Sequence, residues 1–207
     1  MTTQIIGICG FIGSGKDTAA DYLVNFHEFR RDSFASTLKD AVAAVFGWDR
    51  ELLEGRTKSA REWREQIDLW WAQRLNMPDL TPRLVLQLWG TEVCRRSFHD
   101  DIWIASLEAR LRNSKDNIVI SDCRFPNEIK AIKNAGGKVI WIQRGALPSW
   151  YNIALSANAG FKADQDSLKE LSIHASETAW VGTVFDATIG NNGTVDQLFS
   201  QLKLVVQ

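Results

Sequence analysis

The sequence predicts an α/β fold in which a parallel sheet is covered by helices, and three observations support this class. Short apolar runs rich in β-branched residues alternate along the chain with stretches of helical periodicity. The chain has 207 residues, about the size of one such domain, and 45% of them are apolar, which is enough to fill a core. A glycine-rich loop directly follows the first apolar run, where a strand would pass into a helix. We therefore expect residues 1–207 to form a single domain.

Four strands are predicted from the apolar runs. The first covers 4–9 and ends in a glycine cluster. The second covers 117–121 and ends in Asp122, and the third covers 138–143. The last is expected at 185–189. Because helical stretches separate these strands, the sheet is predicted to be parallel.

Helices are predicted in the first half of the chain from periodicity and capping residues. One is expected from about 15 to 26, and another from about 38 to 46, where Gly47 ends it. Ser59 opens the capping box Ser-Ala-Arg-Glu and is expected to begin a longer helix. One broad apolar face of that helix would carry Trp63, Ile67, Trp70, Trp71 and Leu75.

The next two helices lie before the second predicted strand. Thr81 with Pro82 at the first helical position begins one that runs toward Arg96. Asp100 or Asp101 opens the other, which is expected to end near 112.

Two further helices and one irregular segment complete the prediction. Pro126 begins a helix that is closed by a glycine pair at 136–137. After a turn at 191–193, Thr194 caps the last helix. Residues 144–183 carry few regular signals and are predicted to form a mobile flap.

Composition excludes several classes of protein. The 24 Lys and Arg residues balance 25 Asp and Glu residues, so a general binder of nucleic acids or membrane surfaces is not expected. Cys9, Cys94 and Cys123 lie far apart, which argues against a zinc site or a disulfide framework and favours buried reduced thiols. The first residues do not resemble a signal peptide, and no apolar run is long enough to span a bilayer. The cytoplasm is therefore the expected compartment.

Tryptophan is unusually frequent, with nine residues in the chain. Six of them lie between Trp48 and Trp103, so the excess belongs to one region. Most should be core residues, because aromatic side chains at helical spacing usually contribute to packing.

The glycine-rich loop at 10–16 matches the pattern G-x-x-x-x-G-K between a strand and a helix. In such a loop, backbone amides surround phosphate oxygens, the helix dipole favours negative charge, and the lysine places a cation on the β- and γ-phosphates. In most such loops the lysine is followed by a Ser or Thr that helps to hold Mg²⁺. Here Asp17 occupies that position, and Thr18 is the next residue. The G-K-x-T order resembles nucleoside monophosphate kinases more than GTPases or motor ATPases, and an N-K-x-D guanine signature is missing from the sequence.

Beyond the loop, a set of distinctive stretches is distributed over nearly the whole chain. The stretches are Gly13–Asp21, Phe34-Ala35 with Leu38-Lys39, Leu86–Arg95 with Asp101–Trp103, Ser121–Glu128 with Gly136-Gly137, His174–Glu177 and Ile189–Thr194. In their order and spacing, these stretches together resemble the bacteriophage deoxynucleoside monophosphate kinases.

The resemblance implies transfer of a phosphoryl group from ATP, with Mg²⁺, to a deoxynucleoside monophosphate (dNMP). It also implies the P-loop kinase fold, with a five-stranded parallel sheet. A helical monophosphate-binding region would occupy about 34–113, and a lid about 144–183. The chain departs from the family pattern at Cys94 and Cys123 and shares little of the lid beyond His174 and Glu177.

Roles in binding ATP and in catalysis follow from the loop and from the resemblance. Lys16, Asp122, Arg124 and Arg144 are the expected catalytic residues, since phosphoryl transfer needs cations and metal ligands near the phosphates. Asp122 follows the carboxyl end of a predicted strand, where open α/β sheets bind their ligands. It would hold Mg²⁺ together with Thr18. The alternative is that Asp122 is a structural residue or a helix cap. The expected ATP-binding residues are Gly13, Ser14, Gly15, Lys16, Asp17, Thr18 and Asn191.

The acceptor nucleotide is expected to bind a second set of residues. Arg95 and Arg124 are expected to bind its phosphate, because the guanidinium group matches the geometry of phosphate oxygens. The alternative is that these arginines are exposed and bind no ligand. Trp89 or Trp103 would border the base. The whole expected set is Phe34, Lys39, Gln87, Trp89, Thr91, Glu92, Arg95, Trp103, Arg124 and Asn127. His174 and Glu177 are expected to anchor the lid, or else to be ordinary polar loop residues.

Two other readings stay open. One keeps the loop but changes the acceptor to a ribonucleotide, a coenzyme A precursor or a phosphorylated small alcohol. The other is a P-loop ATPase that acts as a switch or nucleic-acid motor, which the balanced charge and the solitary Asp122 disfavour. ATP and a dNMP are the expected partners, with no nucleic acid or membrane. A homodimer is left open.

Overall fold

The computed structural model describes residues 3–206, which form two compact units. One unit contains the described residues up to Ser33 together with those from Glu108 onward, and the other is Phe34–Leu107.

A five-stranded parallel sheet forms the first unit, in the order β2-β3-β1-β4-β5. Its parallel class and its five strands were both predicted. The central strand is β1, which pairs with β3 on one side and β4 on the other. The strands are β1 (Ile5–Cys9), β2 (Phe29–Asp32), β3 (Asn117–Ile120), β4 (Lys138–Gln143) and β5 (Ala187–Gly190).

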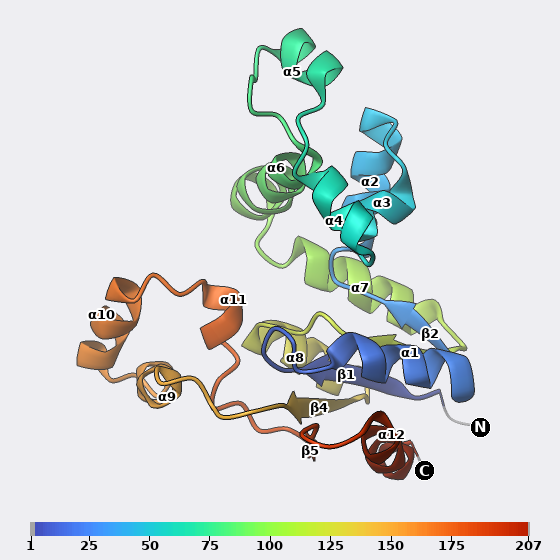
Figure 1. Ribbon diagram of the computed structural model, residues 1–207, viewed down its shortest axis with the longest axis vertical. Helices are drawn as coiled ribbons and strands as arrows, with labels where there is room; N and C mark the ends of the chain where they lie inside the picture. Colours follow the sequence, from blue (N-terminus) through green and yellow to red (C-terminus); the bar gives the residue numbers. More distant parts are fainter. Residues whose placement is uncertain (1–2, 207) are drawn as a thin grey trace. The chain divides into compact units, whose positions relative to one another are not determined.

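Helices cover both faces of this sheet (Figure 1). On one face, α1 (Lys16–Phe26) and α12 (Val195–Val205) pack against the apolar side chains of the strands. On the other face lies α8 (Pro126–Asn134), where Ile132 would meet any side chain placed at Gly7 of β1. The start of α8 at Pro126 and the Thr194 cap of α12 confirm the predicted helix boundaries.

Strand β2 is the element that the sequence did not locate. Its residues are Phe-Arg-Arg-Asp, so it lacks the apolar run by which the other strands were found. It lies at the edge of the sheet, where polar residues are tolerated. Asp32 at its end is buried, and its carboxylate accepts hydrogen bonds from Arg110 Nε at 3.1 Å and Arg110 Nη2 at 3.0 Å. This paired charge stabilises the end of a strand that has few apolar contacts of its own.

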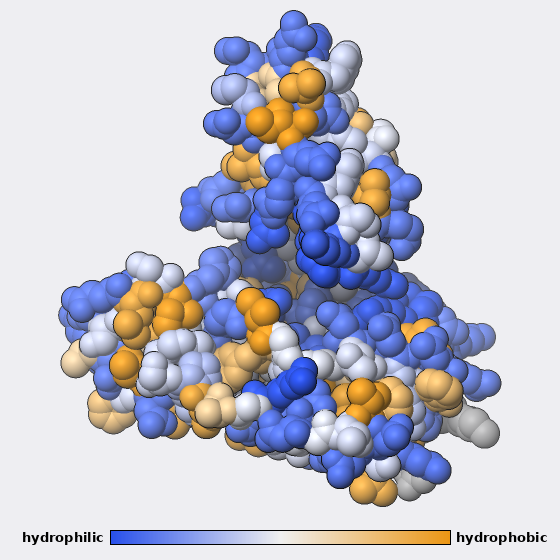
Figure 2. Space-filling view, in the orientation of Figure 1, coloured by the Kyte–Doolittle hydropathy of each residue, from blue (hydrophilic) through white to orange (hydrophobic). Residues whose placement is uncertain are grey.

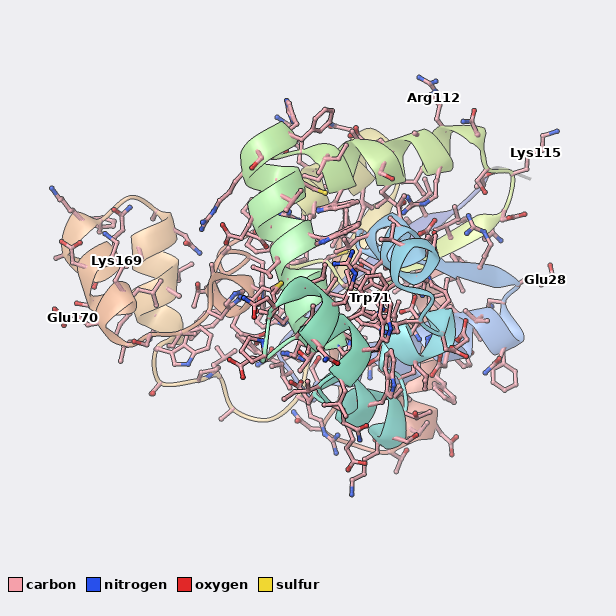
Figure 3. The ribbon with its side chains drawn as sticks, turned by 90° about the horizontal axis from the view of Figure 1, so that it is seen from above. Glu28, Trp71, Arg112, Lys115, Lys169 and Glu170 are labelled. Carbon is pink, nitrogen blue, oxygen red and sulfur yellow. The ribbon has the colours of Figure 1, made fainter. Side chains whose placement is uncertain are left out.

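The segment 144–183, in which the sequence gives few regular signals, contains three helices. They are α9 (Tyr151–Asn158), α10 (Lys162–Glu170) and the short α11 (Ala175–Thr178). The polar composition of α10 explains the missed signal: none of its residues is buried, and Lys169 and Glu170 at its end point outward (Figure 3).

The second unit is helical. The expected helix from about 38 to 46 is present as α2, and Gly47 ends it with a left-handed backbone, φ 69°. The predicted cap at Thr81 is confirmed, because its hydroxyl accepts a hydrogen bond from Leu84 N. The helices are α2 (Ser36–Phe46), α3 (Arg50–Glu54), α4 (Lys58–Arg64), α5 (Leu69–Leu75), α6 (Pro82–Gln87), the π-helix η1 (Leu88–Phe98) and α7 (Ile102–Asn113), which continues into the first unit.

The long helix predicted from Ser59 is two separate helices, and its cap is Thr57. The Thr57 hydroxyl accepts a hydrogen bond from Ala60 N at 3.1 Å, which starts α4. A second cap, Asp68, accepts a hydrogen bond from Trp71 N at 3.1 Å and starts α5. This second cap breaks the predicted face, and Trp70 is consequently exposed. Other exposed apolar residues in and next to α5 are Ile67, Leu69 and Leu75, and Figure 2 shows apolar atoms on this surface.

Five of the tryptophans between residues 48 and 103 contribute to the core of this unit, as predicted. Trp103 is 8% exposed, and the others are partly buried against the same cluster. Three of the indole N–H groups are hydrogen-bonded: Trp48 Nε1 donates to Asp68 Oδ2 at 2.8 Å, Trp71 Nε1 to Phe46 O at 3.1 Å and Trp103 Nε1 to Gly90 O at 2.9 Å.

The three cysteines are all free thiols. Cys9 and Cys123 are buried free thiols, as expected, whereas Cys94 is half-buried. Over residues 3–206, no helix is both long and apolar enough to cross a membrane.

Candidate active site

The loop between β1 and α1 has the backbone that a phosphate-binding loop requires. Ser14 N donates to Phe11 O at 3.2 Å, which closes a tight turn before the helix begins. Gly10 has φ 149° and Gly15 has φ 99°, conformations that residues with a side chain rarely adopt. A Cβ atom at Gly10 would also collide with the carbonyl oxygen of Ile142, and one at Gly15 with the Asn191 amide. Both glycines are therefore required by the packing around the loop.

Lys16 lies folded over this loop. Its ammonium donates to Gly10 O and to Phe11 O, both at 2.7 Å. Burial lowers the pKa of Lys16, the charge of Arg124 lowers it further, and the carboxylate of Glu177 acts in the opposite direction. A phosphate group bound here would lie beside the cations of Lys16 and Arg124 and would reduce the repulsion between them.

Ser14 supplies a buried hydroxyl without a partner. The residue is 3% exposed, and its Oγ makes no hydrogen bond within the part of the chain that the structure describes. Buried polar atoms are nearly always bonded, so an unpaired one inside a phosphate-binding loop indicates a place for a ligand oxygen.

The residues after Lys16 have different surroundings. Asp17 forms an ion pair with Arg31 of β2, with 2.7 Å between Oδ1 and Nη2. Thr18 is exposed. Arg31 was not singled out from the sequence, because its strand was not located, and only pairing of β2 with β3 brings it to this loop.

The turn after β3 carries Arg124. Glu128 is buried, and its Oε2 accepts from Arg124 N at 2.8 Å and Phe125 N at 3.1 Å, which fixes the turn at the start of α8. The Arg124 guanidinium donates from Nη1 to Glu177 Oε1 at 2.8 Å and to Ser176 Oγ at 3.3 Å. Two residues predicted from distant parts of the sequence, Arg124 and Glu177, are thus in direct contact.

Other predicted residues of the first unit occupy distinct positions. His174 caps α11, and its Nδ1 accepts from Ser176 N at 3.2 Å. Asn191 contacts the loop: its Nδ2 donates to Ser14 O at 2.8 Å, and its backbone N donates to Gln143 O at 2.7 Å. Asp122 is half-buried directly after β3, and Arg144 is exposed after β4. Asn127 is exposed, and its Oδ1 accepts from Glu128 N at 3.1 Å in the first turn of α8.

The predicted acceptor residues of the second unit are distributed along its helices. Phe34 is buried, Trp89 is half-buried against the core cluster, and Trp103 Nε1 donates to Gly90 O at 2.9 Å. Lys39 forms an ion pair with Glu54 at 2.6 Å. Gln87 and Thr91 are exposed, Glu92 pairs with Arg96, and Arg95 is half-buried.

Several of these residues lie on a π-helix. Helix η1 spans 11 residues, and His99 N donates to Cys94 O at 3.0 Å, the five-residue spacing of this helix type. Such helices are rare and are frequently found at functional sites. Its wider turn was not predicted, because the sequence pattern of Leu88–Phe98 resembles an ordinary helix.

A parallel sheet with a glycine-rich, lysine-containing loop between its central strand and α1 defines the class of P-loop nucleotide-binding proteins. A scan against protein-family models finds no match. A deoxynucleoside-5'-monophosphate kinase of Escherichia phage T5 is 30% identical over 173 residues, which are 60% of this chain and 69% of that protein. The chain belongs to the deoxynucleoside monophosphate kinase family, and the resemblance to these enzymes is confirmed.

Other proteins are similar to this chain. A protein of Acanthamoeba polyphaga mimivirus, provisionally named a deoxynucleotide monophosphate kinase, is 29% identical over 96% of this chain and 93% of its own length. Among solved structures, shikimate kinase from Aquifex aeolicus matches 98% of this chain and 96% of its own, at 11% identity and a TM-score of 0.48. Dephospho-CoA kinase from Campylobacter jejuni matches 99% and 96%, at 15% identity and a TM-score of 0.35. Since both scores are below 0.5, family membership is defined by the sequence relatives alone.

Proposed function

We propose that this protein transfers the γ-phosphoryl group of ATP to a dNMP, giving a deoxynucleoside diphosphate and ADP. An oxygen of the acceptor phosphate attacks the γ-phosphorus, and the bond from that phosphorus to the bridging oxygen of ADP breaks. The observation that carries the proposal is the contact set of Lys16: its ammonium donates to Gly10 O and Phe11 O of the glycine-rich loop, both at 2.7 Å, and Arg124 is a neighbouring cation.

The loop binds the phosphates of ATP in this proposal. Lys16 would exchange its bonds to two loop carbonyls for bonds to the β- and γ-phosphates, and Ser14 Oγ would gain its missing partner. Asn191 would border the adenine, since its side chain already holds the loop through Ser14 O. The remaining members of the proposed ATP site are Gly13, Gly15 and Thr18. Asp17 also belongs to the site by its position at the start of α1, but its carboxylate is paired with Arg31 and would not bind a phosphate itself.

Two further residues would act on the transferring group. Arg124 would bind the acceptor phosphate and keep it close to Lys16, because a guanidinium fork matches phosphate oxygens. Arg144, exposed after β4, would reach the phosphoryl group when its segment closes. The acceptor is already an ionised phosphate, so neither His174 nor Glu177 is needed as a strong base.

The residues present fit Mg²⁺ bound together with ATP. Among residues 3–206 no group of three or more His, Cys, Asp or Glu side chains gathers as a metal cluster. Mg²⁺ in kinases usually takes phosphate oxygens, water and one or two protein ligands, and Thr18 and Asp122 would serve here. When bound, the ion neutralises charge on the β- and γ-phosphates.

The second unit would bind the nucleoside and the phosphate of the acceptor. Residues about 34–113 form the proposed monophosphate-binding region, and about 144–183 the proposed lid, anchored through His174 and Glu177. The acceptor residues in this proposal are Phe34, Lys39, Gln87, Trp89, Thr91, Glu92, Arg95, Trp103, Arg124 and Asn127. Action in the cytoplasm, with no nucleic acid or membrane partner, completes the proposal.

A panel of acceptors tests this function. ADP production from ATP and Mg²⁺ should be measured with each dNMP, each ribonucleoside monophosphate, dephospho-coenzyme A and DNA. We expect ADP to form with at least one dNMP and with none of the other acceptors at comparable kcat/KM. A preference for a ribonucleotide or a coenzyme A precursor would contradict the proposed dNMP acceptor and show that the protein is a kinase for another class of acceptor. Stimulation by DNA without any response to monophosphates would contradict the kinase function.

A further inference from the structure

Arg31 connects three side chains around the phosphate loop. Its Nη2 donates to Asp17 Oδ1 at 2.7 Å and to Ser121 Oγ at 3.0 Å, and its Nη1 donates to Asp21 Oδ1 at 3.1 Å. The Arg31 side chain is only 13% exposed, so its charge is largely removed from water and balanced by these two carboxylates.

The partners of Arg31 lie at two functionally distinct places. Asp17 and Asp21 are one turn apart on the same side of α1, and Asp17 directly follows Lys16. Ser121 directly follows β3 and precedes Asp122. One guanidinium group on the edge strand β2 therefore fixes the first turns of α1 relative to the end of β3.

The charge of Asp17 poses a problem for binding a polyphosphate. Its side chain is 86% exposed at the amino end of α1, the place where a phosphate group binds in loops of this kind. The helix dipole tolerates a carboxylate there, but ATP brings several negative charges to the same end. Without a cation beside it, Asp17 would repel the phosphates, most strongly at low salt.

We propose that Arg31 is a positioning residue for ATP, which neutralises Asp17 and holds its carboxylate on the flank of α1. This inference rests on the proposed function and adds to it a residue that contacts no phosphate itself. It also accounts for the unusual residue after Lys16: the carboxylate is accommodated because an arginine from β2 reaches it.

Arg30 offers a matched control. It is the neighbouring arginine on the same strand, and it also contacts two carboxylates, Asp116 at 3.2 Å and Asp32 at 3.5 Å. Neither of its partners belongs to the loop or to α1. Replacing Arg30 thus removes a similar set of ion pairs without touching Asp17.

The experiment compares the wild type with Arg31→Ala, Arg31→Lys, Arg30→Ala, Asp17→Asn and the double variant Arg31→Ala/Asp17→Asn. Calorimetry gives the Kd for ATP, steady-state kinetics give KM for ATP and for the dNMP, and thermal unfolding monitors the fold. We expect Arg31→Ala to raise the Kd and KM for ATP about tenfold at low salt, with a smaller effect on the dNMP. Arg31→Lys should be intermediate, because one ammonium cannot bridge three partners, and Arg30→Ala should leave the Kd for ATP unchanged.

Removing the charge of Asp17 separates positioning from a general structural role. In the double variant the repulsive carboxylate is gone, so the Kd for ATP should return most of the way to the wild-type value even if unfolding stays at the lower temperature. Asp17→Asn alone should lower the Kd, since Arg31 is then unopposed. If Arg31→Ala does not fold, Asp17→Asn alone still tests the role of Arg31, because Asp17 is exposed and its replacement should leave the fold intact.

The outcomes are distinct. A wild-type protein that does not bind ATP would end the proposed function itself. If the wild type binds ATP, an unchanged Kd in Arg31→Ala, a double variant as weak as Arg31→Ala, or a higher Kd in Asp17→Asn would each overturn the role of Arg31.

Discussion

Arg124 is the residue whose contacts connect the most parts of the proposed site. Its backbone N–H is held by Glu128, its guanidinium by Glu177 and Ser176, and its charge acts on Lys16. Ser176 and Glu177 lie in the short helix α11, more than 50 residues further along the chain. A change at Arg124 is therefore expected to alter the binding of the acceptor while leaving the loop backbone intact.

Arg124→Ala should raise the KM for the dNMP about tenfold or more, and the KM for ATP much less, because a charge-assisted hydrogen bond contributes about 1.5–3 kcal/mol. Steady-state kinetics with each substrate varied in turn measure both effects. Arg112→Ala serves as the control, since Arg112 is exposed on α7 and its guanidinium points away from the protein (Figure 3). Equal increases of the two KM values would contradict the assignment of Arg124 to the acceptor.

The sequence identified the residues of the phosphate loop better than their partners. Gly10, Gly15 and Lys16 were recognisable because they belong to a local sequence pattern that lies between a predicted strand and a predicted helix. The contacts of Arg31 with Asp17 and of Arg124 with Glu177 join segments that are distant in the sequence. No local pattern encodes such contacts, which depend on the order of the strands.

At the scale of secondary structure, helix caps decide where the helices of the second unit begin. Two hydroxyl residues, Thr57 and Ser59, lie at the start of α4, and from the sequence either could be its cap. Thr57 is the cap in the structure, whereas Ser59 lies inside the helix with its hydroxyl 3.0 Å from that of Thr57.

This assignment predicts a difference between two similar substitutions. Thr57→Ala should lower the free energy of unfolding by about 1 kcal/mol, because it leaves Ala60 N without its acceptor, while Ser59→Ala should change it by less than about 0.5 kcal/mol. Urea unfolding followed by tryptophan fluorescence measures both. A larger loss for Ser59→Ala than for Thr57→Ala would restore the original sequence interpretation.

Most elements, but not all, could be predicted. Strands β1, β3 and β4 were found within a residue or so, because buried parallel strands read as continuous apolar runs. The edge strand β2 and helix α10 were missed, since their stability comes from ion pairs and from neighbouring helices rather than from an apolar pattern of their own. The break between α4 and α5 was missed because Asp68 is a cap only once Trp48 and Leu80 have folded against it.

For the molecule as a whole, two buried thiols make stability depend on pH. Burial raises the pKa of Cys9 from 9.0 to about 12, and burial likewise raises the pKa of Cys123. In the unfolded chain each thiol ionises at an ordinary pKa, so above about pH 9 the unfolded state loses protons that the folded state keeps. The stability from the neutral thiol is complete below the unfolded pKa and is lost as the pH rises toward the folded pKa.

The free energy of unfolding should consequently fall by about 1.4 kcal/mol per pH unit for Cys9 between about pH 9 and about pH 12. Cys9→Ala should remove that part of the slope, whatever it does to stability at neutral pH. Urea unfolding at several pH values measures the slope, and Cys94→Ala is the control, since Cys94 is only half-buried. An identical slope in the wild type and in Cys9→Ala would refute the prediction.

The central claim is that this P-loop kinase donates the γ-phosphoryl group of ATP to a dNMP. ATP labelled in the γ-phosphoryl group, incubated with the protein, Mg²⁺ and the preferred dNMP, tests that claim most directly. We predict that the label appears in the deoxynucleoside diphosphate, one for each ADP formed. Lys16→Ala should reduce this transfer by about 10²–10³-fold, whereas Lys133→Ala, which removes an ion pair with Asp186 away from the loop, should not. Label released as inorganic phosphate, or transfer that persists in Lys16→Ala, would contradict the account.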